Sequence, residues 1–116
     1  MSRVIRLNIF LAALLLIVTS SFAITPEEAA DHIGETVTVS GVVEEVFISK
    51  PGNVFLNFGG KYPNHKFVAV FFAKTSDISL FEDPKQYEGK NVSVTGKVKL
   101  YKGKPEIIVK KSTQIQ

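Results

Sequence analysis

The stretch Val54–Phe72, VFLNFGGKYPNHKFVAVFF, predicts a pair of strands at the centre of the fold. The two predicted strands, Val54–Phe58 and Lys66–Ala73, are rich in β-branched and aromatic residues, whereas the glycines, proline and asparagine between them are typical of a turn. Five of the nine Phe of the chain lie in this stretch, together with Tyr62. We therefore expect it to form either the densest part of a core or a surface on which flat ligands stack.

Alternation within the stretch separates an inner from an outer face. Side chains of a strand point to opposite faces in turn, so Phe55 and Asn57 share one face and Phe58 lies on the other. The polar Asn57 indicates that the Phe55 side faces outwards and that Phe58 lies in the core. The residues expected to be exposed are Phe55, Asn57, Tyr62 and Lys66, and the other aromatic side chains are assigned to the core.

Upstream of this stretch the sequence predicts a short helix and a long strand. Thr25 and Glu28 match a capping box around a helix over Pro26–Ile33. The strand Thr36–Ile48 then has alternating Val and Ser/Thr, interrupted by Gly41. A glycine inside a strand often marks a bulge or a bend, so this strand could serve two sheets.

Downstream, residues 89–98 repeat the pattern of residues 34–43, because both read G-x-x-V-x-V-[ST]-G-x-V. A strand over Asn91–Tyr101 is predicted, followed by a tight turn and a last strand over Glu106–Lys110. Two strands that are bent by a glycine at the same point indicate a small closed barrel, since closure needs strong twist and coiling. Lys74–Lys90 has no strand period and is expected to hold short helical turns, one through Leu80-Phe81 and one over Pro84–Tyr87.

The first 23 residues have the features of a signal peptide: an n-region with Arg3 and Arg6, a short apolar run, and Ser21-Phe22-Ala23 at the end. We expect cleavage after Ala23 and no stable membrane anchor afterwards, because the run is shorter than the roughly 20 residues that cross a bilayer. The chain then divides into a signal peptide (1–23), a short N-terminal helix (24–34), a barrel domain (35–111) and a polar tail (112–116). Periplasmic or secreted localisation follows from this interpretation.

The charge of the chain is unevenly distributed. Without the first 23 residues, twelve Lys and no Arg stand against eleven acidic residues, a net charge of +1. Residues 24–49 hold six acids and no base, whereas residues 50–116 hold all twelve Lys. One part of the surface is therefore expected to be basic on a nearly neutral protein. The chain has no Cys, so its core must hold the fold without a disulfide.

Three motifs carry a resemblance to a known family: GETVTVSGVV at residues 34–43, LNFGGKYPNHKFVAVFF at residues 56–72, and YEGKNVSVTGKVKLYKGKPEIIV at residues 87–109. With these motifs the chain resembles the exported single-domain OB-fold proteins of bacteria, which are related to the tRNA-anticodon-binding type of OB domain. The resemblance implies an all-β, five-stranded OB-fold barrel with the order β-β-β-α-β-β. It also implies nucleic-acid binding, the function usually given to such proteins.

An OB barrel presents its second and third strands, with the loops between strands 1–2 and 4–5, as its usual binding surface. On this chain that surface maps to one set of lysines, aromatic residues and an asparagine. The candidate residues for binding single-stranded nucleic acid are Lys50, Phe55, Asn57, Tyr62, Lys66, Lys97, Lys99, Tyr101, Lys102 and Lys104. Lysines for phosphates and rings for bases are what a single-strand binder needs, while the lack of Arg disfavours base-specific contacts.

Catalysis is not expected. His32 and His65 lie in different predicted elements without metal-ligand spacing, and neither a nucleophile elbow nor a phosphate loop is present. The acidic pairs, such as Glu44-Glu45, are interpreted as solvated surface. Relatives with a similar LNFG segment include phosphodiesterases of the micrococcal-nuclease class, which need a catalytic Arg that the processed chain lacks. We therefore predict no enzyme activity, no metal and no cofactor.

Two other functions stay open. The same barrel could bind a periplasmic protein, a glycan or a small ligand, because Phe55, Tyr62 and Tyr101 would stack on sugars as well as on bases. It could also be an interaction or stress protein without a small ligand.

Overall fold

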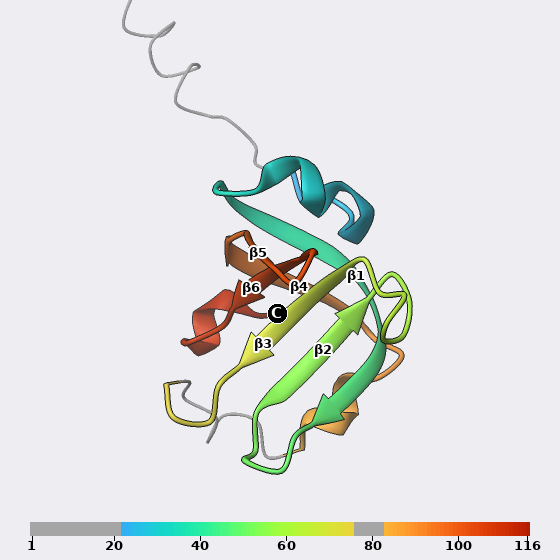
Figure 1. The fold of residues 1–116 in the computed structure, drawn as a ribbon, viewed down its shortest axis with the longest axis vertical. Helices are drawn as coiled ribbons and strands as arrows, with labels where there is room; N and C mark the ends of the chain where they lie inside the picture. The colour runs from blue at the N-terminus through green and yellow to red at the C-terminus, as the bar shows by residue number, and fades with distance from the viewer. Residues whose placement is uncertain (1–21, 76–82) are drawn as a thin grey trace, which may run out of the picture.

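The computed structural model describes residues 22–75 and 83–116 (Figure 1). The described residues form one curled sheet with short 3-10 helices around it. The strands are β1 (Thr36–Ile48), β2 (Val54–Phe58), β3 (Phe67–Phe71), β4 (Asn91–Lys97), β5 (Lys99–Tyr101) and β6 (Lys104–Ile108). The 3-10 helices are η1 (Pro26–His32), η3 (Pro84–Tyr87) and η4 (Ser112–Gln114).

The sheet has the strand order β4-β1-β2-β3-β6-β5. The first half of β1 pairs with β4 and the second half with β2, so β1 is shared between two walls, as its length suggested. The two outermost strands of the order, β4 and β5, are joined by Val98 alone, and the sheet therefore curls round on itself. The all-β, OB-like barrel predicted from the sequence is confirmed.

The predicted single strand over Asn91–Tyr101 is instead two strands. Val98 still pairs with the two residues just before β1, because its N–H donates to the Glu35 carbonyl (3.0 Å) and its carbonyl accepts from the Gly34 N–H (2.8 Å). The next residue, Lys99, pairs with Glu106 of β6. The chain thus changes partner at Val98, which is a tertiary event that alternation does not reveal.

Glycines in β1 and β4 allow close approach of other elements. A Cβ on Gly41 would lie 2.7 Å from the Pro26 Cγ of η1, and a Cβ on Gly96 would lie 2.6 Å from the Ile107 Cγ2 of β6. The backbone of β1 also has a register shift between Val43 and Glu45. The predicted bend at the glycines is therefore accompanied by tight packing at both positions.

The interior of the barrel is filled mainly by Phe and Val side chains. Phe58, Phe67 and Phe71 are among the largest fully buried residues, and the Phe58 and Phe67 ring centroids lie 5.3 Å apart. The assignment of these aromatic residues to the core is confirmed. Leu100, which alternation places with the core valines, is 60 % exposed because β5 lies at the end of the barrel wall.

Both ends of the described chain pack on the barrel. Helix η1 begins with the predicted capping box, in which the Thr25 N–H donates to Glu28 Oε1 at 2.8 Å, and its Ala29 is fully buried. At the other end, residues 112–116 fold back: Ile115 forms a bridge with Val94 and packs against the core.

Two predictions lie outside the described residues, namely the body of the signal peptide and the helical turn through Leu80-Phe81. The other predicted turn, Pro84–Tyr87, is confirmed as η3. Among the described residues, no helix combines the length and the hydropathy that a membrane crossing requires.

Candidate ligand-binding face

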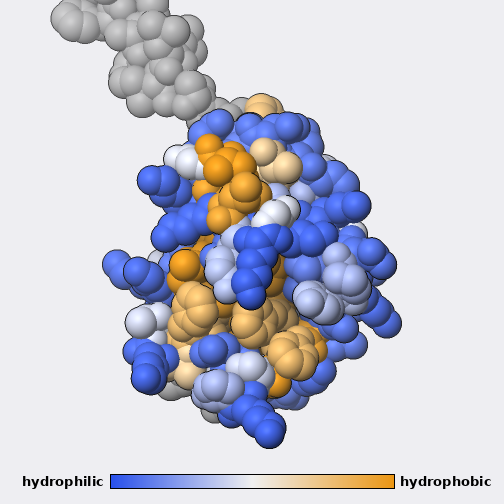
Figure 2. Space-filling model, viewed as in Figure 1, coloured by the Kyte–Doolittle hydropathy of each residue, from blue (hydrophilic) through white to orange (hydrophobic). Residues whose placement is uncertain are grey.

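The register of the strands aligns two rows of outward side chains across the barrel. One row, named the apolar row, consists of Phe47, Phe55, Val70 and Ile108. The neighbouring polar row consists of Glu45, Asn57, Val68, Glu106 and Lys99. We call the surface formed by both rows the front face. Figure 2 shows large apolar side chains gathered over β1, β2 and β3 and surrounded by hydrophilic ones.

Two phenylalanine rings form the most exposed part of the apolar row. Phe47 is 55 % exposed, and its ring centroid lies 5.9 Å from that of the half-buried Phe55, with 36° between the ring planes. Val70, opposite Phe55 on β3, is buried. The rings therefore sit on a packed wall and present apolar surface to the solvent, as a stacking site for a planar group requires.

Phe47 was missed by the sequence interpretation. The register shift between Val43 and Glu45 changes the phase of β1, so alternation counted from Val43 does not tell which way Phe47 points. The sequence nevertheless contained a signal for the outward position of Phe47. A hairpin that turns over residues 49–53 places Phe47 directly opposite Phe55, and cross-strand pairs share a face.

Asn57 is only 4 % exposed, so the expectation that it is exposed is wrong. Its Nδ2 donates to Glu45 Oε1 at 2.9 Å, and the same oxygen accepts the Tyr62 N–H at 3.0 Å. These two hydrogen bonds, the one from Tyr62 first, hold the pKa of Glu45 below its usual value. Glu45 is therefore the anchor of the β2–β3 loop and not plain solvated surface, whereas its neighbour Glu44 is exposed.

The β2–β3 loop folds beside the front face. Tyr62 is 75 % exposed and its ring stacks on His65 with 5.9 Å between centroids. His65 is 5 % exposed, and its carbonyl accepts a hydrogen bond from Lys104 Nζ at 2.8 Å. Burial, and then the charge of Lys104, lower the pKa of His65, while Glu45 raises it. Lys104 is thus occupied by the loop, and Tyr62 remains available to a ligand.

A carboxyl group lies in the middle of the polar row. Glu106 is 8 % exposed, and burial raises its pKa, an effect that Lys99 on the paired strand partly offsets. Burial destabilises the ionised form of a carboxyl that has no close ion-pair partner. This residue was not singled out by the sequence, where it is part of the GKPEI segment.

The remaining candidate residues are spread around the front face. Tyr101 is 58 % exposed at the β5–β6 hairpin, and Lys102 Nζ lies 5.3 Å from the centre of its ring. Lys50 is exposed in the β1–β2 turn, and Lys99 belongs to the polar row. Lys99 and Lys102 thus lie near β5, three strands away from Phe55 in the order of the sheet.

The structure separates two lysines from this group. Lys97 lies on β4 opposite Thr36, so the predicted row of Lys97, Lys99 and Tyr101 is divided by the change of partner at Val98. Lys66 packs beside Gly59, close to which Glu27 of η1 also lies. The part of the chain that the structure describes contains no cluster of three or more His, Cys, Asp or Glu that could hold a metal ion.

No protein-family model and no curated protein matches the sequence. Solved structures do show the fold. An OBody bound to hen egg-white lysozyme is similar with a TM-score of 0.58 and 14% identity, over 78% of this chain and 90% of that chain.

Parts of two synthetases are similar as well. The aspartyl-tRNA synthetase from Entamoeba histolytica matches 86% of this chain with a TM-score of 0.58 and 19% identity. The asparaginyl-tRNA synthetase from Pyrococcus horikoshii matches 74% with a TM-score of 0.54 and 21% identity. The chain spans only 22% and 19% of these two synthetases, so the likeness concerns one barrel within each.

Proposed function

We propose that this protein is a binding module that holds single-stranded nucleic acid on its front face, weakly and without sequence specificity. The observation that carries the proposal is the exposed Phe47–Phe55 ring pair, on a face to which Lys99 of β5 also belongs. Rings that stack on bases together with cations that track phosphates are the usual means of sequence-tolerant single-strand binding. The similarity of the barrel to parts of two tRNA synthetases supports nucleic acid as the ligand class.

The charges of the face account for weak binding. Glu45 and Glu106 lie on the same face as Lys99, so the local field for a polyanion is mixed. Each phosphate contact adds a salt-dependent contribution, and the face offers few of them. Within residues 22–75 and 83–116 no cluster of side chains could hold a metal ion, and the proposed role is non-catalytic.

The stacking role of Phe47 can be measured by titration of single-stranded DNA and RNA homopolymers at increasing salt. Phe47→Ala should weaken binding by roughly 1–3 kcal/mol, because one base loses its stacking partner. Affinity of the parent protein should fall with salt as counterions are released.

Val42→Ala is the matched control, because Val42 is a similarly exposed apolar residue of β1 that pairs with Asn91 on the other wall. It should leave the affinity unchanged. Absence of binding at low salt, or equal losses in both variants, would show that the front face is not a nucleic-acid site.

We also propose that the protein is exported and that residues 1–23 are removed, which would place it in the periplasm or outside the cell. Ile24 supports this boundary: its N–H donates to the Thr38 carbonyl at 2.8 Å and its carbonyl accepts from the Ser40 N–H at 2.9 Å. The preceding Phe22 is 83 % exposed. Intact-mass measurement of the protein from fractionated bacterial cells should give a chain that begins at Ile24, and an unprocessed chain in the cytosolic fraction would contradict export.

A protein or glycan partner is the second candidate. The OBody structure is an example of an OB-like barrel bound to a protein, and the apolar centre of the front face is compatible with such a contact. A complex that is recovered by cross-linking and resists nuclease, together with no oligonucleotide binding, would favour this candidate.

A further inference from the structure

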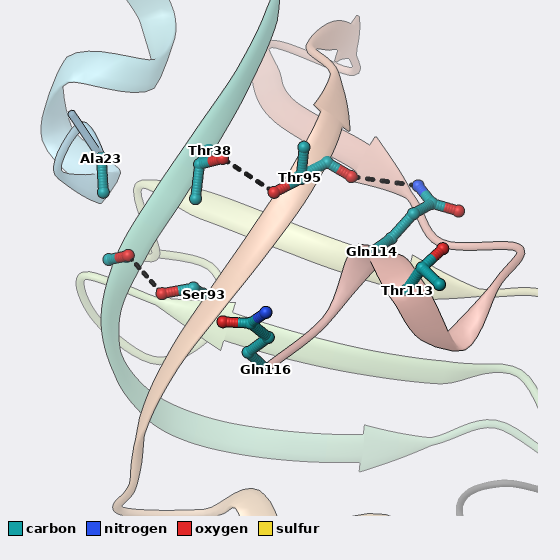
Figure 3. A pocket seen from close by; sticks show the side chains of 8 residues that line it. Ala23, Thr38, Ser93, Thr95, Thr113, Gln114 and Gln116 are labelled. Carbon is teal, nitrogen blue, oxygen red and sulfur yellow. Dashed lines mark hydrogen bonds between the residues drawn. The ribbon is translucent and has the colours of Figure 1, made fainter. Parts of the chain in front are cut away.

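A second surface of the barrel carries hydroxyl groups instead of rings. On the wall formed by β4 and the first half of β1, Thr38 faces Thr95 and Ser40 faces Ser93. The hydroxyls of each pair are hydrogen-bonded to one another, at 2.7 Å between Thr38 and Thr95. This wall borders a pocket of about 250 Å³ that the folded-back residues 113–116 close on one side (Figure 3).

The C-terminal side of the pocket is held in place by Gln114. Its Nε2 donates to the carbonyls of Thr95 (3.1 Å) and Ile108 (3.2 Å), and its Oε1 accepts the N–H groups of Lys110 (2.8 Å) and Lys111 (3.0 Å). All the hydrogen-bonding groups of this carboxamide are therefore occupied within the protein.

The backbone next to Gln114 is held as well. Ser93 and Gln116 exchange two backbone hydrogen bonds of 2.9 and 3.0 Å. The pocket is thus preformed by the fold, and binding would require little ordering of the chain.

Other polar groups at the pocket still have donors and acceptors with which a ligand could form hydrogen bonds. A hydroxyl pair uses one of its two donors internally, so each of the two pairs retains one donor and several acceptor lone pairs. The Thr113 hydroxyl and the Gln116 carboxamide line the pocket and have no hydrogen-bond partner in the part of the chain that the structure describes. The side chains that line the cavity therefore supply uncharged donors and acceptors.

The lining also excludes several ligand classes. It contains neither a charged side chain nor an aromatic ring, so it offers no counter-charge to a phosphate or carboxylate and no stacking surface to a base. Ala23 contributes a methyl group at one edge, and the other lining residues all follow the proposed cleavage position. The volume is below the roughly 300–1,000 Å³ of sites for drug-sized molecules, which favours a single small ring or polyol.

We propose that this pocket binds a neutral polyhydroxylated ligand, of the chemical class of one monosaccharide unit. Such a ligand both donates and accepts hydrogen bonds through each hydroxyl, which matches the paired hydroxyls of Thr38–Thr95 and Ser40–Ser93. The site lies on the β1–β4 wall and is separate from the front face, so it does not depend on nucleic-acid binding.

The test is a titration of the isotope-labelled protein, followed by amide chemical shifts, with glucose, N-acetylglucosamine and myo-inositol as probes. At least one probe should give saturable shifts at Thr38, Ser93 and Gln116, with the Phe47 and Phe55 amides unchanged. The double variant Thr38→Val/Thr95→Val should bind about tenfold more weakly, since it loses two hydroxyl groups that each contribute a few-fold.

Thr36→Val is the matched control, because Thr36 is an exposed residue of the same strand that does not line the pocket, and it should bind as the parent does. Valine keeps the β-branched shape, and replacing both partners of a hydrogen bond is nearly neutral for stability. Should the double variant nevertheless unfold, Gln116→Ala provides the same test, because the backbone hydrogen bonds of Gln116 remain. Shifts that do not saturate with any probe, or an affinity that neither variant lowers, would overturn the proposal.

Discussion

Glu45 shows how one side chain can decide the position of a loop. Its Oε1 receives hydrogen bonds from the Asn57 side chain and from the Tyr62 backbone, which join β1, β2 and the β2–β3 loop. Adjacent Glu44 makes no such contact that the structure records and is exposed. Alternation places the two adjacent acids on opposite faces of β1, but only the folded structure shows that Glu45 is the one that meets Asn57 and Tyr62.

Loss of the Glu45 carboxylate should destabilise the fold. In Glu45→Ala the buried Asn57 amide loses its acceptor, and an unsatisfied buried polar group costs about 1–3 kcal/mol. Urea unfolding measures the change. Glu44→Ala is the control and should stay within about 0.5 kcal/mol of the parent; equal effects of the two variants would contradict the anchoring role.

Loss of the Glu106 carboxylate should instead stabilise the fold at neutral pH. Its folded-state pKa is raised by burial, so the folded state binds a proton more tightly than the unfolded chain does. Stability is therefore lost as pH rises through the interval between the unfolded and the folded pKa, and the loss persists at pH 7. Glu106→Gln removes this penalty and should raise the melting temperature at pH 7.

Below pH 4 the carboxyl of Glu106 is protonated in both states, and the difference between Glu106→Gln and the parent should disappear. Thermal unfolding at pH 3 and pH 7 checks this, with Glu44→Gln as the exposed control. A gain of the same size at both values of pH would mean that the effect is not due to ionisation.

The element that organises the barrel is β1. It pairs with β4 and β2 through its two halves, and its Gly41 lies against η1 where the strand changes partner. The sequence indicated both the length of β1 and the special position of Gly41. It did not indicate that the neighbour of Gly41 is the ring of Pro26, because the helix and the strand meet only in the folded chain.

Gly41→Ala should destabilise the protein by about 1–3 kcal/mol, since the new methyl group would lie 2.7 Å from Pro26 Cγ and 3.0 Å from Pro26 Cδ. Pro26→Ala removes both of these atoms. In a double-mutant cycle the cost of Gly41→Ala should therefore be smaller in the Pro26→Ala background. Urea unfolding of the four proteins measures it, and an unchanged cost would show that the contact is not the cause.

The barrel as a whole has two surfaces with different kinds of side chain, each on its own wall. The front face carries two rings, one lysine and two acids, whereas the β1–β4 wall carries hydroxyls and carboxamides. The near-neutral balance of charge predicted for the processed chain agrees with a protein whose rings, and not its net charge, dominate the proposed binding. Strand β1 contributes to both surfaces, because its two halves belong to different walls.

Local patterns in the sequence were enough for most elements of the fold, but not for the division of Asn91–Tyr101 into β4 and β5. The capping box of η1, the alternation in β1 to β4, the apolar β2 and β3 and the tight hairpin before β6 depend on neighbours within a few residues, and these neighbours are present in the unfolded chain as well. For the same reason the burial of Phe58 could be predicted from alternation and from the polarity of Asn57.

The composition of the candidate sites was decided by long-range pairing. The bulge in β1 turned Phe47 outwards beside Phe55, the bond to Glu45 buried Asn57, and the change of partner at Val98 put Lys97 and Lys99 on different walls. The hydroxyl pocket exists because residues 113–116 return to β4 across the barrel. Each of these outcomes depends on contacts between residues far apart in the chain, whose geometry arises only when the sheet closes.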